Sequence, residues 1–173
     1  NLTSDIPNSK TIWYQKHMAH HLIKLDNLSW ITDFYNCILI RSPKYVINSY
    51  IKKNNLTNVR ELGYPQQFSI LKFLQKKGIK FHIIDADILL NNPEKILNQW
   101  CNHLNIKFDQ NMLLWEKGEH KNDGIWGKHW YKNVNNSTKF LIRNTSESKN
   151  YKDFESIYND AVYYYKKLYN FIS

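Results

Sequence analysis

The sequence predicts one α/β domain, residues 1–173, built on a parallel β-sheet. Continuous apolar runs at 36–41 and 80–86 are typical of strands that are buried on both faces. Amphipathic helical segments alternate with these runs, as right-handed crossovers between parallel strands require. With 173 residues, of which 42% are apolar, the chain is long enough to bury one core.

Two predicted strands deliver basic residues to a loop. Residues 11–18 begin with β-branched and aromatic side chains and then turn polar, which predicts a strand with Lys16 near its carboxyl end. The run at 36–41 ends in Arg41. Ligands of open α/β sheets bind outside the carboxyl ends of the strands. We therefore expect 11–18, 36–41 and 80–86 to be neighbouring parallel strands with a ligand at this edge.

Helices are predicted between and after the strands. Ser42 followed by Pro43 is a favourable N-cap and first-turn pair, so a helix should begin directly after Arg41. Residues 108–148 are irregular, rich in Trp, Gly and Lys, and too long for a passive connection, which makes them a candidate functional region. The remaining predicted helices are 65–77 with Gly78 as its stop, a short turn from Asp87, a helix opened by Asn92-Pro93, and 149–172.

Composition limits the class of partner and compartment. The formal charge of +9 favours a phosphate-bearing partner, although the lysines are spread without forming a tract. Cys37 and Cys101 lie in predicted core elements without metal-ligand spacing, so we expect buried thiols in a reducing compartment and no structural zinc. The sequence has no apolar run long enough to span a membrane and no signal-peptide core. These features predict a cytoplasmic protein that does not bind membranes.

Arg41 and the helix after it could form a phosphate site. Ser49 lies seven residues after Ser42, about two helical turns, so it returns to the same helix face roughly 10 Å along. A guanidinium fork and a hydroxyl can converge on one phosphate. The alternative is that Arg41 pairs with a surface carboxylate and Ser49 faces solvent.

Four segments resemble P-loop sulfotransferases in the same order. I-L-I-R-S-P-K-Y-V-I-N-S-Y at 38–50 is similar to the strand and helix that bind the donor's 3′-phosphate. Q-K-H-M-A-H-H-L at 15–22 resembles a strand end of a bacterial-type subfamily. I-D-A-D-I-L-L-N-N-P-E at 84–94 and E-K-G-E-H-K-N-D-G-I-W-G-K-H-W at 116–130 resemble later elements. The resemblance covers about residues 11–140.

This resemblance implies a three-layer, parallel-sheet fold of the P-loop NTPase type. It also implies transfer of a sulfuryl group from 3′-phosphoadenosine 5′-phosphosulfate to a small hydroxyl or amine acceptor. Arg41 and Ser49 would hold the donor's 3′-phosphate, and Lys117 and Gly118 would contact it from the later loop. Rings in this loop could cover the adenine or an acceptor, or could belong to the core: Trp126, Trp130 and Tyr131.

Sulfuryl transfer needs a base for the acceptor's proton and a cation for the leaving phosphate. His20 is the first choice as base, with His21 and His17 as alternatives, and Lys16 is the charge stabiliser. A histidine cluster could instead bind a divalent metal, because His17 and His21 would share a helix face. The segment has no acidic residue to complete such a site, so we expect no metal. A solvated turn with one buried histidine is the structural alternative.

The sequence also departs from the family pattern. The loop for the 5′-phosphosulfate should precede residue 11, yet residues 1–10 contain no glycine, and Glu116 stands where many members have Arg. We therefore expect the fold to be N-terminally incomplete, with the first βα unit missing. Residues 1–173 alone should not turn over the donor. A sheet edge left without its strand would favour association, including formation of an oligomer.

Other functional classes are less consistent with the sequence. A non-catalytic basic module could bind a nucleotide, RNA or an anionic protein. The predicted strands are apolar and lack the aromatic-interleaved basic face that RNA binding favours, so nucleic acid is the weaker hypothesis. A nucleotide kinase is disfavoured because no G-x-x-x-x-G-K-[ST] motif occurs.

Overall fold

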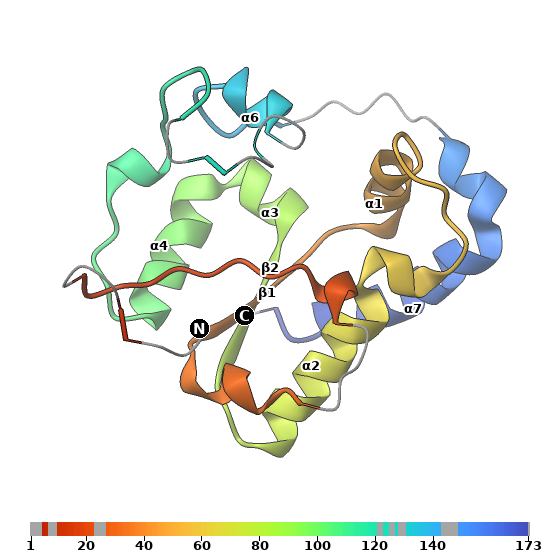
Figure 1. Ribbon diagram of the computed structural model, residues 1–173, viewed down its shortest axis with the longest axis horizontal. Coiled ribbons are helices and arrows are strands. Elements are labelled where there is room, and N and C mark those ends of the chain that lie inside the picture. Colours follow the sequence, from red (N-terminus) through yellow and green to blue (C-terminus); the bar gives the residue numbers. More distant parts are fainter. Residues whose placement is uncertain are drawn as a thin grey trace. The chain divides into compact units, whose positions relative to one another are not determined.

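The structure is a computed structural model that forms two compact units. One unit is Asn1–Asp85 together with Glu147–Ser173, and the other is Ala86–Ser146. The first unit contains the β-sheet (Figure 1). It also contains the two hydrophobic clusters found among the described residues. The structure describes residues 5–6, 10–22, 27–120, 123–124, 127, 131–142 and 149–172.

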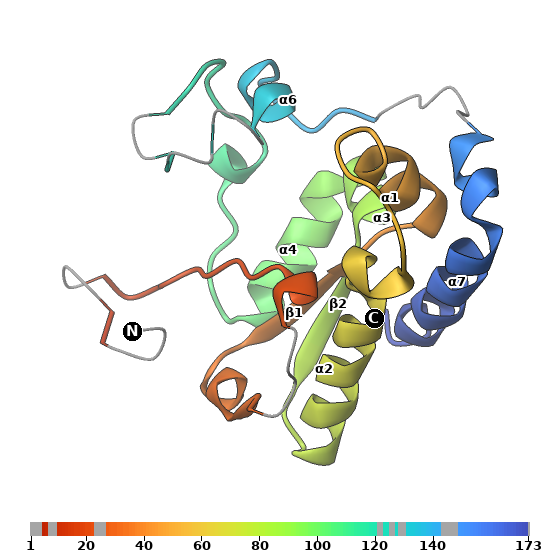
Figure 2. The same ribbon diagram turned by 45° about the vertical axis from the view of Figure 1, so that its right-hand side comes forward.

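A two-stranded parallel sheet organises the first unit (Figure 2). Strand β1 (Asn36–Ile40) pairs with β2 (Phe81–Asp85), with Ile38 opposite Ile83 and Ile40 opposite Asp85. The α/β class and the parallel pairing of these two runs are therefore confirmed. The predicted three-layer fold and the predicted single domain over residues 1–173 involve both units, and they stay predictions.

The predicted strand at 11–18 is wrong. Within the described part of the chain, residues 10–18 form no strand. Ile12 and Tyr14 are 59% and 80% exposed. Three apolar residues are followed at once by Gln15-Lys16-His17, so this segment has too little apolar surface to be buried in a sheet.

Strand β1 buries one face only, which corrects the expectation of burial on both. Side chains alternate along a strand, and the core packs on the face that carries Ile38 and Ile40. Cys37 and Leu39 are exposed on the other face, so the expectation of a buried Cys37 is wrong. The expected burial of Cys101 is confirmed. Strand β2 does bury consecutive residues, His82 to Asp85.

Helices pack on the Ile38 face of β1. The buried cluster combines Ile38, Ile40 and Ile83 with side chains from α2 and α7. Leu71 of α2 and Leu168 of α7 have no exposed surface, and full burial of a leucine contributes about 1.5 to 3 kcal/mol. The bounds are α1 Pro43–Tyr50, α2 Tyr64–Lys76 and α7 Glu155–Tyr169, with 3-10 turns at Ala19–His21, Ser29–Asp33, Val59–Leu62 and Lys149–Phe154. These positions confirm the predicted helices after Arg41 and at 65–77. The segment predicted as one helix at 149–172 is a 3-10 turn followed by α7.

The second unit is helical and then irregular, as expected. It contains α3 (Ala86–Asn91) and α4 (Pro93–His103), and α4 buries Cys101 against Met112, with 3.8 Å between the two sulfur atoms. The later part has a 3-10 turn, the short helix α6 (Lys132–Asn135) and an isolated antiparallel bridge from Leu114 to Lys139. Within the described ranges, no helix combines the length and apolar composition that crossing a bilayer requires.

Two side chains of α2 cap one edge of β1. The Gln67 Nε2 donates to the Leu39 carbonyl at 2.8 Å, and the Tyr64 hydroxyl donates to the Arg41 carbonyl at 2.6 Å. Carbonyls two residues apart point to the same edge of a strand. Helix α2 therefore satisfies acceptors on an edge that another strand could otherwise pair with.

Replacing Tyr64 by Phe should destabilise the protein by about 1 kcal/mol, because the Arg41 carbonyl loses its donor in a part-buried site. Urea unfolding followed by circular dichroism measures this change. Tyr163→Phe is the matched control, since Tyr163 is 55% exposed and should change stability little. Equal effects of the two substitutions would contradict a structural role for the Tyr64 hydroxyl.

Candidate functional site

Arg41 occupies the predicted position at the carboxyl end of β1. It follows Ile40 directly and stands just before α1. Its carbonyl is held by the hydroxyl of Tyr64, whose side chain is 2% exposed. Its guanidinium carbon lies 5.2 Å from the centroid of the Tyr45 ring. The backbone of Arg41 is therefore tied to the core, while its partly exposed side chain lies over an aromatic face.

Helix α1 turns Ser49 outward. Pro43 and Ile47 are buried, whereas Ser49 in the last turn is exposed. The neighbouring Asn48 accepts a hydrogen bond from the Tyr151 backbone N–H at 3.0 Å, which ties this end of α1 to the C-terminal segment. The Ser49 hydroxyl is thus accessible to a ligand. Ser42 occupies the predicted N-cap position, but its side chain makes no capping hydrogen bond.

The predicted histidines lie in and beside a short 3-10 turn, Ala19–His21. The rings of His20 and His21 contact each other edge to face, with 4.3 Å between their centroids. His20 is partly buried and His21 is exposed. His17 lies before the turn and its Nε2 is 3.1 Å from the Gln15 Oε1. The helix face expected to join His17 and His21 does not exist, because the helical turn spans three residues.

Gly63 contacts the histidine turn and precedes Tyr64, the residue that binds the Arg41 carbonyl. It has φ +83, a backbone conformation that favours glycine, and it is the N-cap residue of α2. A Cβ added at Gly63 would lie 3.3 Å from the His20 backbone nitrogen and 3.5 Å from the Ala19 Cβ. The turn containing His20 therefore packs on the residue that precedes Tyr64. Both views draw this turn beside the segment that leads into α2 (Figures 1 and 2). Through Tyr64 this contact reaches the Arg41 carbonyl.

The environment of His20 favours its neutral form. Partial burial lowers the pKa of His20 below its usual value of 6.5, and the neighbouring His21 lowers this pKa further. A neutral imidazole can accept a proton at neutral pH. The His20 imidazole can therefore accept a proton at neutral pH. Lys16 is exposed in the extended segment that leads into the turn.

Lys117 and Gly118 belong to the second unit. The loop around them closes on itself, because the Gly118 N–H donates to the Asn135 carbonyl at 2.9 Å and the Trp115 N–H donates to the Thr138 carbonyl at 3.0 Å. Gly118 has φ +124, which glycine adopts without strain. The Gly118 N–H is thus already bonded within the loop, while the Lys117 side chain is exposed.

The predicted ring residues of this region are only partly described. Trp126 and Trp130 lie outside the described residues. Tyr131 is 37% exposed.

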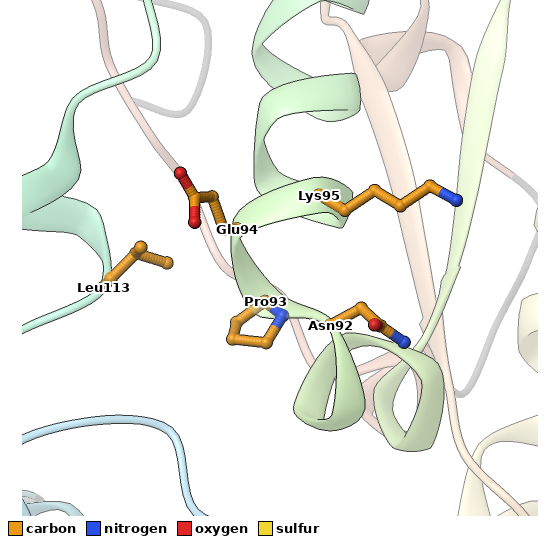
Figure 3. A pocket seen from close by; sticks show the side chains of 5 residues that line it. All are labelled: Asn92, Pro93, Glu94, Lys95 and Leu113. Atoms are coloured by element: carbon orange, nitrogen blue, oxygen red, sulfur yellow. The ribbon is translucent and has the colours of Figure 1, made fainter.

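The second unit also has an open pocket at the start of α4. Figure 3 shows the side chains that line it, with Leu113 facing the first turn of the helix across the hollow. Glu94 accepts a hydrogen bond from the Gln110 side chain at 2.9 Å. The lining holds one carboxylate, Glu94, and one ammonium, Lys95, so its charges do not favour an anionic ligand. It consists of Asn92, Pro93, Glu94, Lys95 and Leu113, and none of these is a predicted site residue.

Among the side chains that the structure describes, no group of three His, Cys, Asp or Glu residues is placed to hold a metal ion. The histidine turn is consistent with this finding, since no carboxylate occurs between Lys10 and Leu22.

The model of the sulfotransferase domain family matches residues 3–169. The chain belongs to this family. It is 31% identical over 166 residues to the Arabidopsis thaliana "Branched-chain-amino-acid aminotransferase-like protein 2", which covers 96% of this chain and 29% of that protein. It is 39% identical over 103 residues to the "aminotransferase-like protein 1" of the same plant, covering 60% of this chain and 18% of that protein. The chain thus spans less than a third of these curated relatives.

A solved structure, the sulfotransferase domain from the curacin biosynthetic pathway, is similar over 71% of this chain and 47% of its own. The two share 20% identity with a TM-score of 0.41.

Several residues of this sulfotransferase domain's site carry no clear signal in the sequence. Tyr64 is 23 residues from its partner Arg41, so no local pattern indicates their hydrogen bond. Gly63 could have been suspected as a turn, since it stands before Tyr-Pro at a helix start. Tyr45 lies four residues after Arg41. This short spacing is the sequence feature that indicates a contact between the guanidinium and the ring.

Replacing Gly63 by Ala should cost more stability than replacing Gly78 by Ala. Both residues have positive φ, so each substitution should cost about 1 to 2 kcal/mol for the left-handed backbone. Only at Gly63 would the new methyl also meet the backbone of His20, whereas nothing lies within 4 Å at Gly78. Urea unfolding measures both costs. A Gly63→Ala cost no larger than that of Gly78→Ala would contradict the close approach of the histidine turn.

NMR titration of the histidine rings should give a midpoint for His20 below 6.5. His20 then has a lower pKa in the folded chain than in the unfolded chain, and between these two values the unfolded chain binds more protons. The free energy of unfolding should therefore rise as the pH rises through that window. His21→Gln should move the His20 midpoint upward, since it removes a neighbouring positive charge. A His20 midpoint at or above 6.5 in the wild-type protein would show that its imidazole is not held neutral.

Proposed function

We propose that this sulfotransferase domain binds 3′-phosphoadenosine nucleotides at the carboxyl end of β1. In this proposal the bound nucleotide is 3′-phosphoadenosine 5′-phosphosulfate, the donor for sulfuryl transfer to a small hydroxyl or amine acceptor. The observation that supports it most is the position of Arg41 at the end of β1, where Tyr64 holds its carbonyl and the adjacent Gly63 contacts the turn that carries His20. Family membership supplies the reaction class.

The 3′-phosphate end of the nucleotide would be held from α1 and β1. Arg41 can present two parallel N–H donors to a phosphate, and its backbone is tied by the bond to Tyr64. The exposed hydroxyl of Ser49 would add a neutral donor from the last turn of α1. Lys117, exposed in the second unit, is proposed as a further cation for the same phosphate, and Trp126 as a cover for the adenine.

Where a 5′-phosphosulfate-binding segment completes the site, the transfer step would take place beside the histidine turn. The acceptor's oxygen or nitrogen forms a bond to sulfur while the bond between sulfur and the bridging oxygen of the donor breaks. His20 would take the acceptor's proton, which its lowered pKa permits at neutral pH. Lys16 would neutralise charge that develops on the leaving phosphate.

Isothermal titration calorimetry should show tighter binding of adenosine 3′,5′-bisphosphate than of adenosine 5′-phosphate. Arg41→Ala should weaken bisphosphate binding by about 1.5 to 3 kcal/mol, roughly 10- to 150-fold, because a charge-assisted contact is lost. Affinity for adenosine 5′-phosphate should change little. Arg60→Ala is the matched control, since this arginine is exposed in another turn of the same unit.

Two results would contradict the proposal. One is equal affinity of the wild-type protein for the two nucleotides, and the other is unchanged binding by Arg41→Ala. Single-stranded RNA at several salt concentrations tests the non-catalytic alternative, which the net charge of +9 favours. RNA binding tighter than bisphosphate binding would replace the nucleotide-donor assignment with that alternative.

A further inference from the structure

Two cationic side chains, Arg41 and Lys44, lie over the ring of Tyr45. The Arg41 guanidinium carbon lies 5.2 Å from the ring centroid, and the Lys44 Nζ lies 4.7 Å from it. Both distances are within the range in which an aromatic face attracts a cation. All three side chains are partly exposed. One ring therefore brings two positive charges together beside the end of β1.

The local charges make this arrangement attractive to an anion. Two like charges near one ring repel each other. Both cations stand at the start of α1, where the helix dipole adds positive potential. The first turn of α1 contains no acidic residue to offset this charge. The attraction of each cation to the ring offsets part of this repulsion. A dianion that contacts both cations would offset more of it.

We propose that Tyr45 is a positioning residue that holds Arg41 and Lys44 for a phosphate monoester, and that Lys44 is the second cation of the site. This inference rests on the proposed function, because the phosphate monoester is the donor's 3′-phosphate. Such a group carries between one and two negative charges at neutral pH. One guanidinium balances part of this charge, and the Lys44 ammonium balances the rest. The pair would favour a terminal phosphate over a singly charged sulfate or phosphodiester.

The test compares variants that keep or remove the ring. Tyr45→Phe keeps the aromatic face and should retain the preference of the wild-type protein for adenosine 3′,5′-bisphosphate over adenosine 5′-phosphate. Tyr45→Leu removes the face and should reduce this preference by about 3- to 10-fold. Calorimetry of both nucleotides on each folded variant gives the affinity ratio. A purely structural role of Tyr45 would lower the melting temperature or both affinities together and leave the ratio unchanged.

Lysine variants test the second cation without altering the ring. Lys44→Gln should reduce the same ratio by about 5- to 10-fold, because a charged contact to the phosphate is lost. Lys52→Gln is the matched control, since Lys52 is exposed just after α1 and should leave the ratio unchanged. Lys44→Gln also keeps the inference falsifiable if Tyr45→Leu does not fold.

The outcomes separate this inference from the proposed function. If Arg41→Ala removes the preference while Tyr45→Leu or Lys44→Gln leaves it intact, the inference is wrong and the proposed function stands. If the wild-type protein binds the two nucleotides equally, the proposed function fails and this inference fails with it. A reduced ratio in Tyr45→Leu and Lys44→Gln, with Tyr45→Phe and Lys52→Gln unchanged, supports the inference.

Discussion

The hydrogen bond from the Tyr64 hydroxyl to the Arg41 carbonyl is the contact on which the site depends. It joins the first turn of α2 to the end of β1 at 2.6 Å. Gly63, one residue earlier, allows the backbone of the histidine turn to approach. One helix start thus fixes two segments that are far apart in the chain. Arg41 and His20 thus share a support at the start of α2.

The sequence predicted the elements better than their burial. The apolar runs of β1 and β2 and the Ser-Pro and Asn-Pro helix starts were local signals, and the structure confirms them. The strand predicted at 11–18 is wrong. Its β-branched and aromatic residues favour a strand, but the polar residues that follow prevent burial in a sheet. The expected burial of Cys37 is wrong, because an apolar run does not indicate which face of a strand the core covers.

The candidate site could be predicted in part, for a physical reason. Arg41 and the histidines stood out because chemistry and position at an element's end mark them in the sequence. Tyr64 and Tyr45 act through contacts across space, and apolar or aromatic residues at such positions usually belong to a core. The sulfotransferase family match supports the reaction class, while the nucleotide, the acceptor and the contribution of Lys117 are assigned here by proposal.

The central claim is that a nucleotide 3′-phosphate binds where α1 and α2 meet the end of β1. Titration of the ¹⁵N-labelled protein with adenosine 3′,5′-bisphosphate, followed through its backbone amide signals, tests this most directly. We expect the largest shifts at Arg41, Lys44, Tyr45 and Ser49, with smaller shifts at the histidine turn, and no such pattern with adenosine 5′-phosphate. Shifts confined to the pocket at Asn92–Lys95, or equal shifts with both nucleotides, would contradict the claim.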